Sequence, residues 1–415
     1  MVPEVLSARR LAAVYATGLL DSEPEEGFDD LARLAAAVAG GQRAFITVVD
    51  ERRSFWKSAV GPGLGGGGPR CNDIPDSPCQ ILIATDKPLI VDDTVADPRT
   101  RDLAAVRALA IGAWAGYPIH SPDGEVLGGL CVLDDRPHKW TEAQIQGLGI
   151  LARSVTTEIG LRQSLEHANE QVRTLQESLL PDVLPAIAGL DVAAAYLPSG
   201  GAEVSGDFYD LFALRRGRWG AVLGDVCGKG VQAAKVTALA RYTLRAEASR
   251  HPSPAMVLDR LNNALIDQQG EDGRFLTAVY ATFRTTPTGV AGRLCTGGHP
   301  PALLYRADGR IQEIGQPGTL LGFAPQVHLA DVQFRLGPGD TLLLYSDGIT
   351  EARGGRGPAS RYPMYGQEHL SEILASCAGQ GAQAALDRIC ATVQEHTAGQ
   401  PGDDIALLAL HVPPA

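Results

Sequence analysis

Residues 219–230 read WGAVLGDVCGKG and carry the strongest fold signal in this sequence. The apolar run 219–226 predicts a buried strand, and residues 231–250 continue with apolar positions at helical spacing. Asp225 comes at the end of the strand, and the glycine before it lets backbone approach a ligand closely. This stretch therefore predicts a strand, a polar loop and a helix, with a carboxylate where the strand ends.

Three further acidic motifs follow or open predicted strands in the same region. They are Ser205-Gly206-Asp207-Phe208-Tyr209-Asp210, Tyr345-Ser346-Asp347-Gly348 and Gly402-Asp403-Asp404-Ile405. If these motifs converge, their carboxylates repel one another and raise each other's pKa. Divalent cations would keep them ionised, and all-oxygen ligands favour Mg²⁺ or Mn²⁺ over zinc.

Two such ions ~3.5–4 Å apart can acidify a bridging water and clamp the oxygens of an in-line phosphoryl displacement. This chemistry needs no covalent nucleophile, and the sequence has neither a Cys-(x)5-Arg loop nor a Gly-x-Ser-x-Gly elbow. Each motif alone is weak evidence, because an isolated Asp347-Gly348 is more often a turn and Asp403-Asp404 also fits a solvated loop. The ordered set of four is much more specific.

Composition limits the class of protein. The chain has 415 residues, 45% hydrophobic and 20% charged, which predicts two or three folded domains and excludes a disordered chain. Its net charge of −12 argues against nucleic-acid binding. Seven cysteines without a CxxC pair argue against a disulfide framework or zinc site. Because no signal peptide or membrane span is recognised, we expect a cytoplasmic protein.

The first region, residues 1–160, predicts a mixed α/β domain with an antiparallel sheet. A helix is expected at 28–38 and a Gly-rich loop at 61–69. The turn signal Ser121-Pro122-Asp123-Gly124 joins two of the expected strands. The strands are predicted at 44–49, 89–91, 113–120 and 126–133.

The second region, residues 161–183, predicts a helical linker. Its apolar residues step by four and three, as in the a/d stripe of a two-stranded coiled coil, and proline ends the helix. An amphipathic helix that lies on its own domain is the alternative. The narrow stripe favours a homodimer formed through the linker, and its residues are Leu161, Leu165, Ala168, Val172, Leu175 and Leu179.

The third region, residues 184–415, alternates strands and helices. A second helix is expected from Ser253-Pro254 onward, since proline suits the first helical position. Besides the strand that ends near Asp225, strands are predicted at 275–283, 341–346 and 405–412.

Residues 175–410 resemble the PPM/PP2C-type serine/threonine phosphatases, specifically the bacterial SpoIIE-like branch. The resemblance implies an α-β-β-α sandwich of two antiparallel sheets with two Mn²⁺ or Mg²⁺ ions held between the sheets. The resemblance rests on the four acidic motifs above, LQESLLP at 175–181, GHPP at 298–301 and the continuations GITEA at 348–352 and IA at 405–406.

The resemblance also implies a role for each matching residue. Asp225 would bridge both metal ions, and the backbone carbonyl of Val226 would ligate the second ion. Asp347 and Asp403 would hold the first ion, and Asp207 would complete the second site, directly or through water. Asp210 is either an outer residue of this site or a structural cap.

The sequence departs from the family pattern at several positions. No arginine that could hold the substrate phosphate stands just before Asp207, and Ser205 replaces a common glycine. Cys227 occupies the place of a histidine in eukaryotic members, which leaves the general acid unassigned. His299 more often closes a turn than donates a proton at such a position. Lys229 between two glycines suggests a phosphate loop, although the Walker A spacing is absent.

The N-terminal region resembles a GAF domain. The resemblance implies a small-ligand pocket over the sheet or a dimerisation module, and Cys79 is either a reactive thiol or an ordinary core residue. It rests on FDDLA at 28–32, TVVD at 47–50, PCQ at 78–80, VDD at 91–93, DPR at 97–99, AGYPI at 115–119 and LGGLCVLD at 127–134.

Together these features predict an α+β protein with a sensor domain, a helical linker and a catalytic domain. The function expected from the resemblance is hydrolysis of phosphoserine or phosphothreonine on a regulatory protein, of the anti-sigma-factor antagonist type, under GAF control. One alternative is a two-metal hydrolase of a small phosphate ester. Another is a sensor or scaffold whose phosphatase domain is weak or silent.

Overall fold

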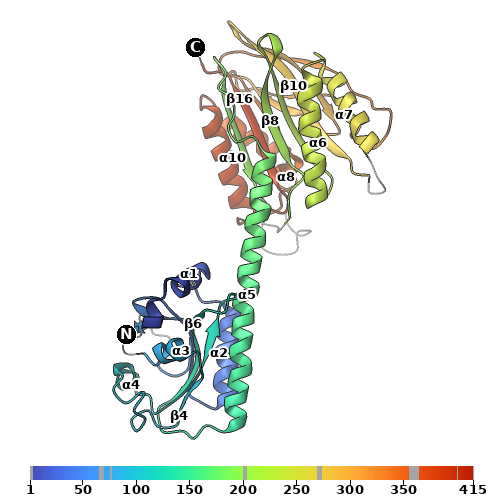
Figure 1. The fold of residues 1–415 in the computed structure, drawn as a ribbon. Coiled ribbons are helices and arrows are strands. Elements are labelled where there is room, and N and C mark those ends of the chain that lie inside the picture. The colour runs from blue at the N-terminus through green and yellow to red at the C-terminus, as the bar shows by residue number, and fades with distance from the viewer. Residues whose placement is uncertain are drawn as a thin grey trace. The chain divides into compact units, whose positions relative to one another are not determined.

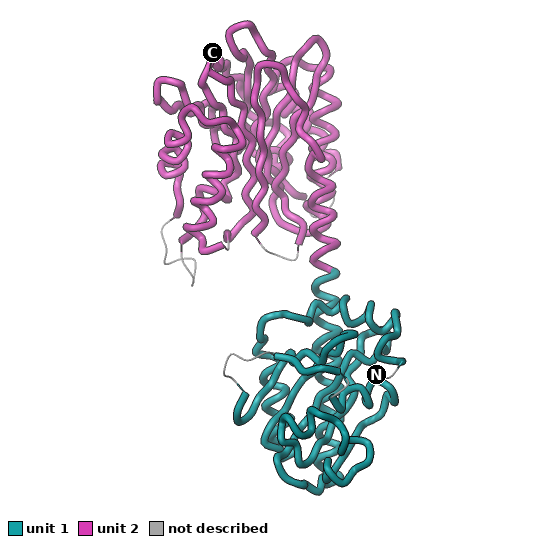
Figure 2. The backbone as a smooth tube through the Cα atoms, turned by 90° about the vertical axis from the view of Figure 1, so that its left-hand side faces the viewer, with its two compact units in different colours: residues 1–167 teal, residues 168–415 magenta. Residues whose placement is uncertain are grey.

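The structure is a computed structural model that describes residues 3–64, 70–74, 77–199, 203–268, 273–354, 364–399 and 401–414. The chain divides into two compact units, residues 1–167 and residues 168–415, which Figure 2 shows in different colours. Each unit is described by itself. None of the helices in the described part of the chain combines the length and apolarity that crossing a bilayer requires.

Unit 1 contains an antiparallel sheet in the order β3-β2-β1-β6-β5-β4. This confirms the predicted sheet and all four predicted strands, while β2 and β3 were not predicted. The predicted turn closes β5 to β6, since the Gly124 amide donates to the Ser121 carbonyl at 2.9 Å. The strands are β1 Arg43–Val49, β2 Arg53–Val60, β3 Cys71–Asp73, β4 Leu89–Val91, β5 Ala113–His120 and β6 Val126–Asp134.

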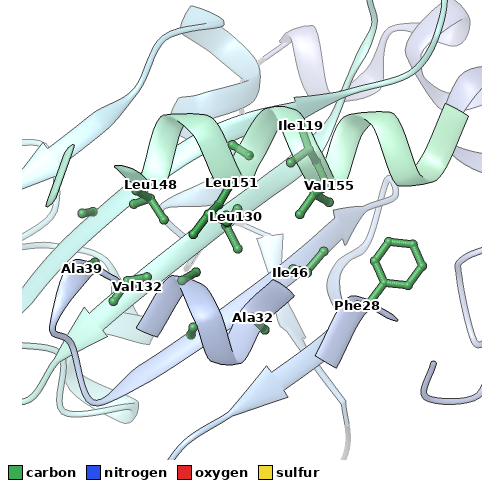
Figure 3. Close-up of a cluster of buried hydrophobic side chains, with 14 of the residues drawn as sticks. Phe28, Ala32, Ala39, Ile46, Ile119, Leu130, Val132, Leu148, Leu151 and Val155 are labelled. Atoms are coloured by element: carbon green, nitrogen blue, oxygen red, sulfur yellow. The ribbon is translucent and has the colours of Figure 1, made fainter. Parts of the chain in front are cut away.

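Helices cover both faces of this sheet. The predicted helix at 28–38 is α2 (Glu26–Ala39), and the other helices are α1 (Ala8–Ala16), α3 (Cys79–Thr85), α4 (Ala104–Ala108) and the first half of α5. Residues 61–64 lie outside helices and strands, as the Gly-rich pattern predicts, while 65–69 lie outside the described residues. On one face α2 and α5 pack against the sheet, and Figure 3 labels Phe28, Ala32, Ala39, Ile46, Ile119, Leu130, Val132, Leu148, Leu151 and Val155 of this cluster.

Helix α5 (Glu142–Leu179) is longer than the predicted helix at 161–179. Its first half buries Leu148, Leu151 and Val155 in unit 1, at the spacing of one helix face. Its second half then turns apolar residues to solvent, since Leu161 and Leu165 are 63% and 58% exposed. The two halves therefore follow different patterns, which is why the coiled-coil stripe alone does not reveal where the helix begins.

Unit 2 contains two antiparallel sheets, in the orders β14-β11-β10-β9-β8 and β13-β12-β15-β16-β7. The strands predicted near 219–226, 275–283, 341–346 and 405–412 are confirmed with small shifts at their ends. The strands are β7 Asp191–Leu197, β8 Phe208–Leu214, β9 Arg218–Val226, β10 Leu276–Thr286, β11 Gly289–Gly297, β12 Ala302–Tyr305, β13 Ile311–Ile314, β14 Val332–Leu336, β15 Thr341–Tyr345 and β16 Ile405–His411.

The two sheets pack face to face, and helices cover their outer faces (Figure 1). Leu223 of β9 faces the opposite sheet, whereas its neighbour Val222 faces helices α6 and α7, as the two-residue period of a strand requires. A third apolar cluster joins the second sheet to α9 and α10. This confirms the α-β-β-α sandwich that the resemblance to the PP2C-type phosphatases implies. The helices are α6 Val231–Ala248, α7 Pro254–Gln268, α8 Asp347–Thr350, α9 Gly366–Ser376 and α10 Ala382–His396.

Candidate active site

The acidic motifs lie at the ends of paired strands in unit 2. Within each sheet, the two strand ends that carry the aspartates are neighbours. Asp207 directly precedes β8, and Asp225 lies one residue before the end of β9, while the register pairs Phe208 with Gly224. In the other sheet, Asp347 follows β15 and Asp403 precedes β16, which run antiparallel to each other. Antiparallel pairing therefore brings the motifs together in pairs.

Glycine permits two close backbone crossings at this edge. A Cβ at Gly206 would lie 2.1 Å from the Val226 carbonyl oxygen and 2.8 Å from Asp225 Oδ1. A Cβ at Gly348 would lie 2.0 Å from the carbonyl oxygen of Asp404. Any side chain would force these loops apart, so the glycines beside the aspartates set how closely the acidic motifs approach.

The electrostatics connect the carboxylates of the two sheets. Burial raises the pKa of Asp207 well above its ordinary value, and the charge of Asp225 adds to the shift. Burial raises the pKa of Asp225 to about 6, and Asp347 and Asp403 from the other sheet contribute. Burial followed by repulsion from Asp403 also raises the pKa of Asp347. The four predicted aspartates therefore act on one another electrostatically.

The donor set fits a hard divalent cation. Asp207 Oδ2 is buried and has no hydrogen-bond partner among the described residues, so a good acceptor is left without a donor. The neighbouring acceptors, including the Val226 carbonyl, are oxygen atoms, which Mg²⁺ and Mn²⁺ prefer. Within the described ranges, no three acidic, histidine or cysteine side chains already converge as a preformed metal site.

Lys229 supplies positive charge to the outer part of this group. Its Nζ lies 2.8 Å from Asp403 Oδ1 and 3.7 Å from Asp404 Oδ2, and it also contacts Ser199 Oγ at 3.3 Å. These contacts hold an ammonium group where a cation ligated by Asp403 would also be attracted.

Two further residues at this edge were not identified from the sequence as site residues. Asp404 is mostly buried, accepts the Ser199 amide at 2.6 Å, and contributes to the raised pKa of Asp207. Arg274 Nη1 donates to the Cys227 carbonyl at 2.7 Å, and a Cβ at Gly228 would lie 2.0 Å from the same nitrogen. Arg274 lies far in the sequence from the motif that contains Asp225, so the spacing of residues in the sequence could not identify it as a site residue.

Asp210 serves the fold on the opposite side of β8. Its buried carboxylate is held by Arg245, whose Nε and Nη2 donate at 2.7 and 2.8 Å, and Arg241 lies 3.4 Å away. Arg245 also lies over the Phe212 ring, with 5.1 Å to the centroid. Of the two possibilities for Asp210, the structural role fits these contacts.

His299 is buried, and both of its ring nitrogens are engaged. Nε2 donates to the Tyr345 carbonyl at 3.0 Å, so Nδ1 accepts from the Thr277 hydroxyl at 2.7 Å. Burial lowers the pKa of His299 to about 4, which keeps the ring neutral. His299 thus connects β10 to β15 through hydrogen bonds, as expected of a structural residue. Cys227, on the loop that follows β9, is exposed.

Comparisons with known proteins agree with this architecture. Residues 215–413 match the family model described as Stage II sporulation protein E (SpoIIE), and residues 23–159 match the GAF domain. Phosphoserine phosphatase RsbU of Bacillus subtilis (strain 168) is 26% identical over 265 residues, which cover 64% of this chain and 76% of RsbU. Protein IcfG of Synechocystis sp. is 26% identical over 269 residues, covering 58% of this chain and 41% of IcfG.

Solved structures include a similar chain. The crystal structure of the RsbU and RsbW domains of a Mycobacterium tuberculosis protein shares 28% identity and gives a TM-score of 0.44. The match covers 56% of this chain and 63% of that one, so this chain spans less than two thirds of both that protein and IcfG. Residues 215–413 therefore form a SpoIIE-type domain of the PP2C class, and residues 23–159, on its N-terminal side, form a GAF domain.

Proposed function

We propose that this chain is a metal-dependent protein phosphatase that removes phosphate from serine or threonine of a cytoplasmic regulatory protein. The observation that carries the proposal is the group of aspartates from both sheets, because burial and mutual repulsion raise the pKa of Asp207 and Asp225. Divalent ions would relieve this repulsion, and phosphoryl transfer is the chemistry that such ions commonly serve.

The residues that would hold two Mg²⁺ or Mn²⁺ ions follow from the motifs. Asp225 would serve both ions, Asp347 and Asp403 the first, and the Val226 carbonyl with Asp207 the second. When bound, the ions would lower the pKa of a water molecule and neutralise negative charge on the phosphate oxygens. We propose domain boundaries near 160 and 183, so that these ligands belong to the phosphatase domain at 184–415 and the helical linker precedes it.

The chain's own cations would bind the substrate phosphate. Lys229 lies on the loop that follows Asp225, and Arg274 contacts the same loop at the Cys227 carbonyl. With Asp403 serving as a metal ligand, the Lys229 ammonium would pair with a phosphate oxygen instead. These two residues would replace the arginine that the sequence lacks before Asp207.

The substrate class is the less direct part of the proposal. RsbU is named a phosphoserine phosphatase, and the similarity to it favours a phosphoserine protein of the anti-sigma-factor antagonist type. Cys227, two residues after Asp225, is exposed to solvent, which is compatible with a protein as the substrate. Two alternatives remain to be distinguished by experiment. The substrate is a small phosphate ester, or the phosphatase domain is silent and serves only for binding.

The test is phosphate release by the full chain with Mn²⁺ from p-nitrophenyl phosphate, a cyclic nucleotide and a phosphoserine protein. We expect the phosphoserine protein to be hydrolysed, and Asp225→Ala to lower kcat/KM at least about 1,000-fold, or ~4 kcal/mol of transition-state stabilisation. Asp308→Ala is the matched control, because Asp308 is an exposed aspartate that pairs with Arg310. Full activity in Asp225→Ala contradicts the mechanism, and absence of both activity and Mn²⁺ binding in wild type supports the silent scaffold.

We further propose that the GAF domain regulates the phosphatase through α5 as a homodimer. In unit 2, Gln176 of α5 accepts the Ser205 amide at 2.7 Å, and the Ser205 hydroxyl accepts the Asp207 amide at 3.0 Å. Arg241 donates to the Leu179 carbonyl at the end of the same helix. A change in α5 therefore has a direct path to the loop that carries Asp207.

The dimer is tested on the exposed stripe of α5. Leu165→Asp with Leu175→Asp should convert a dimer into a monomer, measured by light scattering, because each change places charge in the apolar seam. Ser164→Asp with Thr174→Asp is the matched control, since both are exposed beside the stripe and gain the same charge. A monomeric wild type, or equal dissociation in both double variants, contradicts the coiled-coil dimer.

A further inference from the structure

Unit 1 contains a small cavity that two cysteines line together. Cys79 is the first residue of α3, and Cys131 lies in β6, which pairs with β1 and β5. Both thiols are buried, and both border a cavity that holds about 30 Å³, room for one or two water-sized molecules. The phosphatase site does not use these residues.

Hydroxyl groups surround the Cys79 sulfur on several sides. Thr47 Oγ1 lies 3.3 Å from Cys79 Sγ, and the Ser77 hydroxyl accepts the Cys79 amide at 3.2 Å. Ser54 also borders the cavity, is fully buried, and its Oγ has no hydrogen-bond partner among the described residues. A buried hydroxyl without a partner is costly, and a small polar molecule in the cavity would give the Ser54 hydroxyl a hydrogen-bond partner.

The two thiols differ in acidity. Hydrogen bonding with Cys131 lowers the pKa of Cys79 to about 6 against the effect of burial, and nearby hydroxyls act in the same direction. Burial raises the pKa of Cys131 well above its ordinary value. The hydrogen bonds to Cys79 therefore favour its thiolate form, whereas burial favours the protonated form of Cys131.

Cys295 shows what an ordinary buried cysteine looks like in the same chain. It lies in the apolar cluster between the first sheet of unit 2 and α6 and α7, and burial raises its pKa to about 11. Burial alone raises the pKa of a cysteine in this chain, so the lowered pKa of Cys79 comes from its hydrogen bonds.

We propose that Cys79 and Cys131 form a redox site that reacts with a small hydroperoxide and closes to a disulfide. The Cys79 thiolate attacks the terminal peroxide oxygen, the O–O bond breaks, and the leaving alkoxide or hydroxide takes a proton to give an alcohol or water. The resulting sulfenic acid then reacts with the Cys131 thiol, which forms the S–S bond and releases water. The two thiols lose two electrons, and one peroxide is reduced by two electrons.

Closing the bond would shift the start of α3 relative to β6. The two sulfurs must come within about 2.05 Å of each other. Because Cys79 opens α3, the shift falls on this short helix, which packs on the sheet of the GAF domain through Leu82 and Ile83. The small volume of the cavity, about 30 Å³, favours hydrogen peroxide over bulky organic peroxides.

The test measures thiols in the reduced full chain after treatment with one equivalent of hydrogen peroxide. We expect alkylation under denaturing conditions to label five of the seven cysteines, and a loss of about 2 Da in intact mass. Peptide mapping should identify a Cys79–Cys131 disulfide. Oxidation of Cys79 should be at least about tenfold faster than that of Cys227, although Cys227 is exposed.

Variants separate the two steps. Cys131→Ser should stop the reaction at a sulfenic acid on Cys79, which a 1,3-diketone traps, whereas Cys79→Ser should give neither product. Cys295→Ser is the matched control and should still form the disulfide. Faster oxidation of Cys227 than of Cys79, or no Cys79–Cys131 crosslink in wild type, overturns the proposal. Cumene hydroperoxide, a bulky peroxide, should react at least about tenfold more slowly than hydrogen peroxide, and equal rates would refute entry through the cavity.

Discussion

Asp207 and Asp210 belong to the same short motif and are both buried, yet their surroundings are opposite. Asp210 points to the helical side of β8, where Arg245 holds both of its oxygens at 2.7 and 2.8 Å. Asp207 lies between the sheets, where its Oδ2 has no hydrogen-bond partner among the described residues. The charges that raise its pKa belong to other aspartates, Asp225, Asp404 and Asp347.

The difference distinguishes a structural carboxylate from a ligand. A buried carboxylate that serves the fold brings its own cations, because an unpaired buried charge costs several kcal/mol. A carboxylate left beside like charges is stable only if it is protonated or if a cation arrives from solution. Asp207 and Asp210 are three positions apart, which places them on different sides of β8, and this placement decides their roles.

The largest effect should appear when each carboxylate is made neutral. In EDTA, Asp210→Asn should lower the free energy of unfolding by about 3 kcal/mol, because Arg245 and Arg241 lose their partner. Asp207→Asn should change it by less than about 0.5 kcal/mol, since the raised pKa of Asp207 already favours its neutral form. Urea unfolding measures both values.

Manganese provides the second arm of that experiment. Adding Mn²⁺ should stabilise wild type and Asp210→Asn, because an ion that binds the folded state shifts the unfolding equilibrium. Asp207→Asn should gain less. If the two variants lose equal stability in EDTA and respond equally to Mn²⁺, the distinction between structural carboxylate and ligand is wrong.

His299 represents a third arrangement, a buried ionisable group that stays neutral. Its pKa is lowered to about 4 by burial, so the unfolded chain binds its proton more readily than the folded chain does. Stability from the neutral ring is therefore fully present above pH ~6.5 and is lost as the pH falls towards 4. Between pH 7 and 4.5 the loss should amount to about 2 kcal/mol.

The matched measurement is the difference between wild type and His299→Gln at each pH, both in EDTA. Glutamine does not titrate, and subtraction removes the contribution of the carboxylates. As the pH falls, wild type should lose more unfolding free energy than His299→Gln does, so the advantage of wild type over the variant should decrease. A pH-independent difference would mean that the His299 ring is protonated or solvated in the folded protein.

Sequence pattern predicted that the acidic motifs lie at strand ends, whereas the α-β-β-α architecture followed from the resemblance to known phosphatases. Asp225 follows an apolar run and Asp403 precedes one, so strand ends can be located from pattern alone. Antiparallel pairing then accounts for their meeting at sheet edges. The resemblance to known phosphatases supplied the assignment of each aspartate to an ion, which spacing cannot provide.

Residues that act through tertiary approach were not predictable in this way. Arg274 reaches the loop of Asp225 because β10 pairs with β9, and Asp404 is buried while the adjacent Asp403 is exposed. The start of α5 was missed because its first half is a buried helix and its second half an exposed stripe. In each case the position depends on which elements pack together, and local pattern does not carry that information.

The smallest effect, and the one that sharpens the comparison most, concerns Lys229. It gives Asp403 the cation that Asp207 lacks, at 2.8 Å, but from a half-exposed side chain that a metal ion can displace. Lys229→Met should therefore tighten Mn²⁺ binding, measured by calorimetry, by up to about tenfold, because the ion no longer competes with an ammonium group. The same variant should raise KM for the phosphoprotein, since the proposed phosphate contact is lost.

Lys235→Met on the exposed side of α6 is the matched control and should change neither value. Weaker Mn²⁺ binding in Lys229→Met would instead mean that the lysine organises the carboxylates for the metal, and the competition argued here would be refuted.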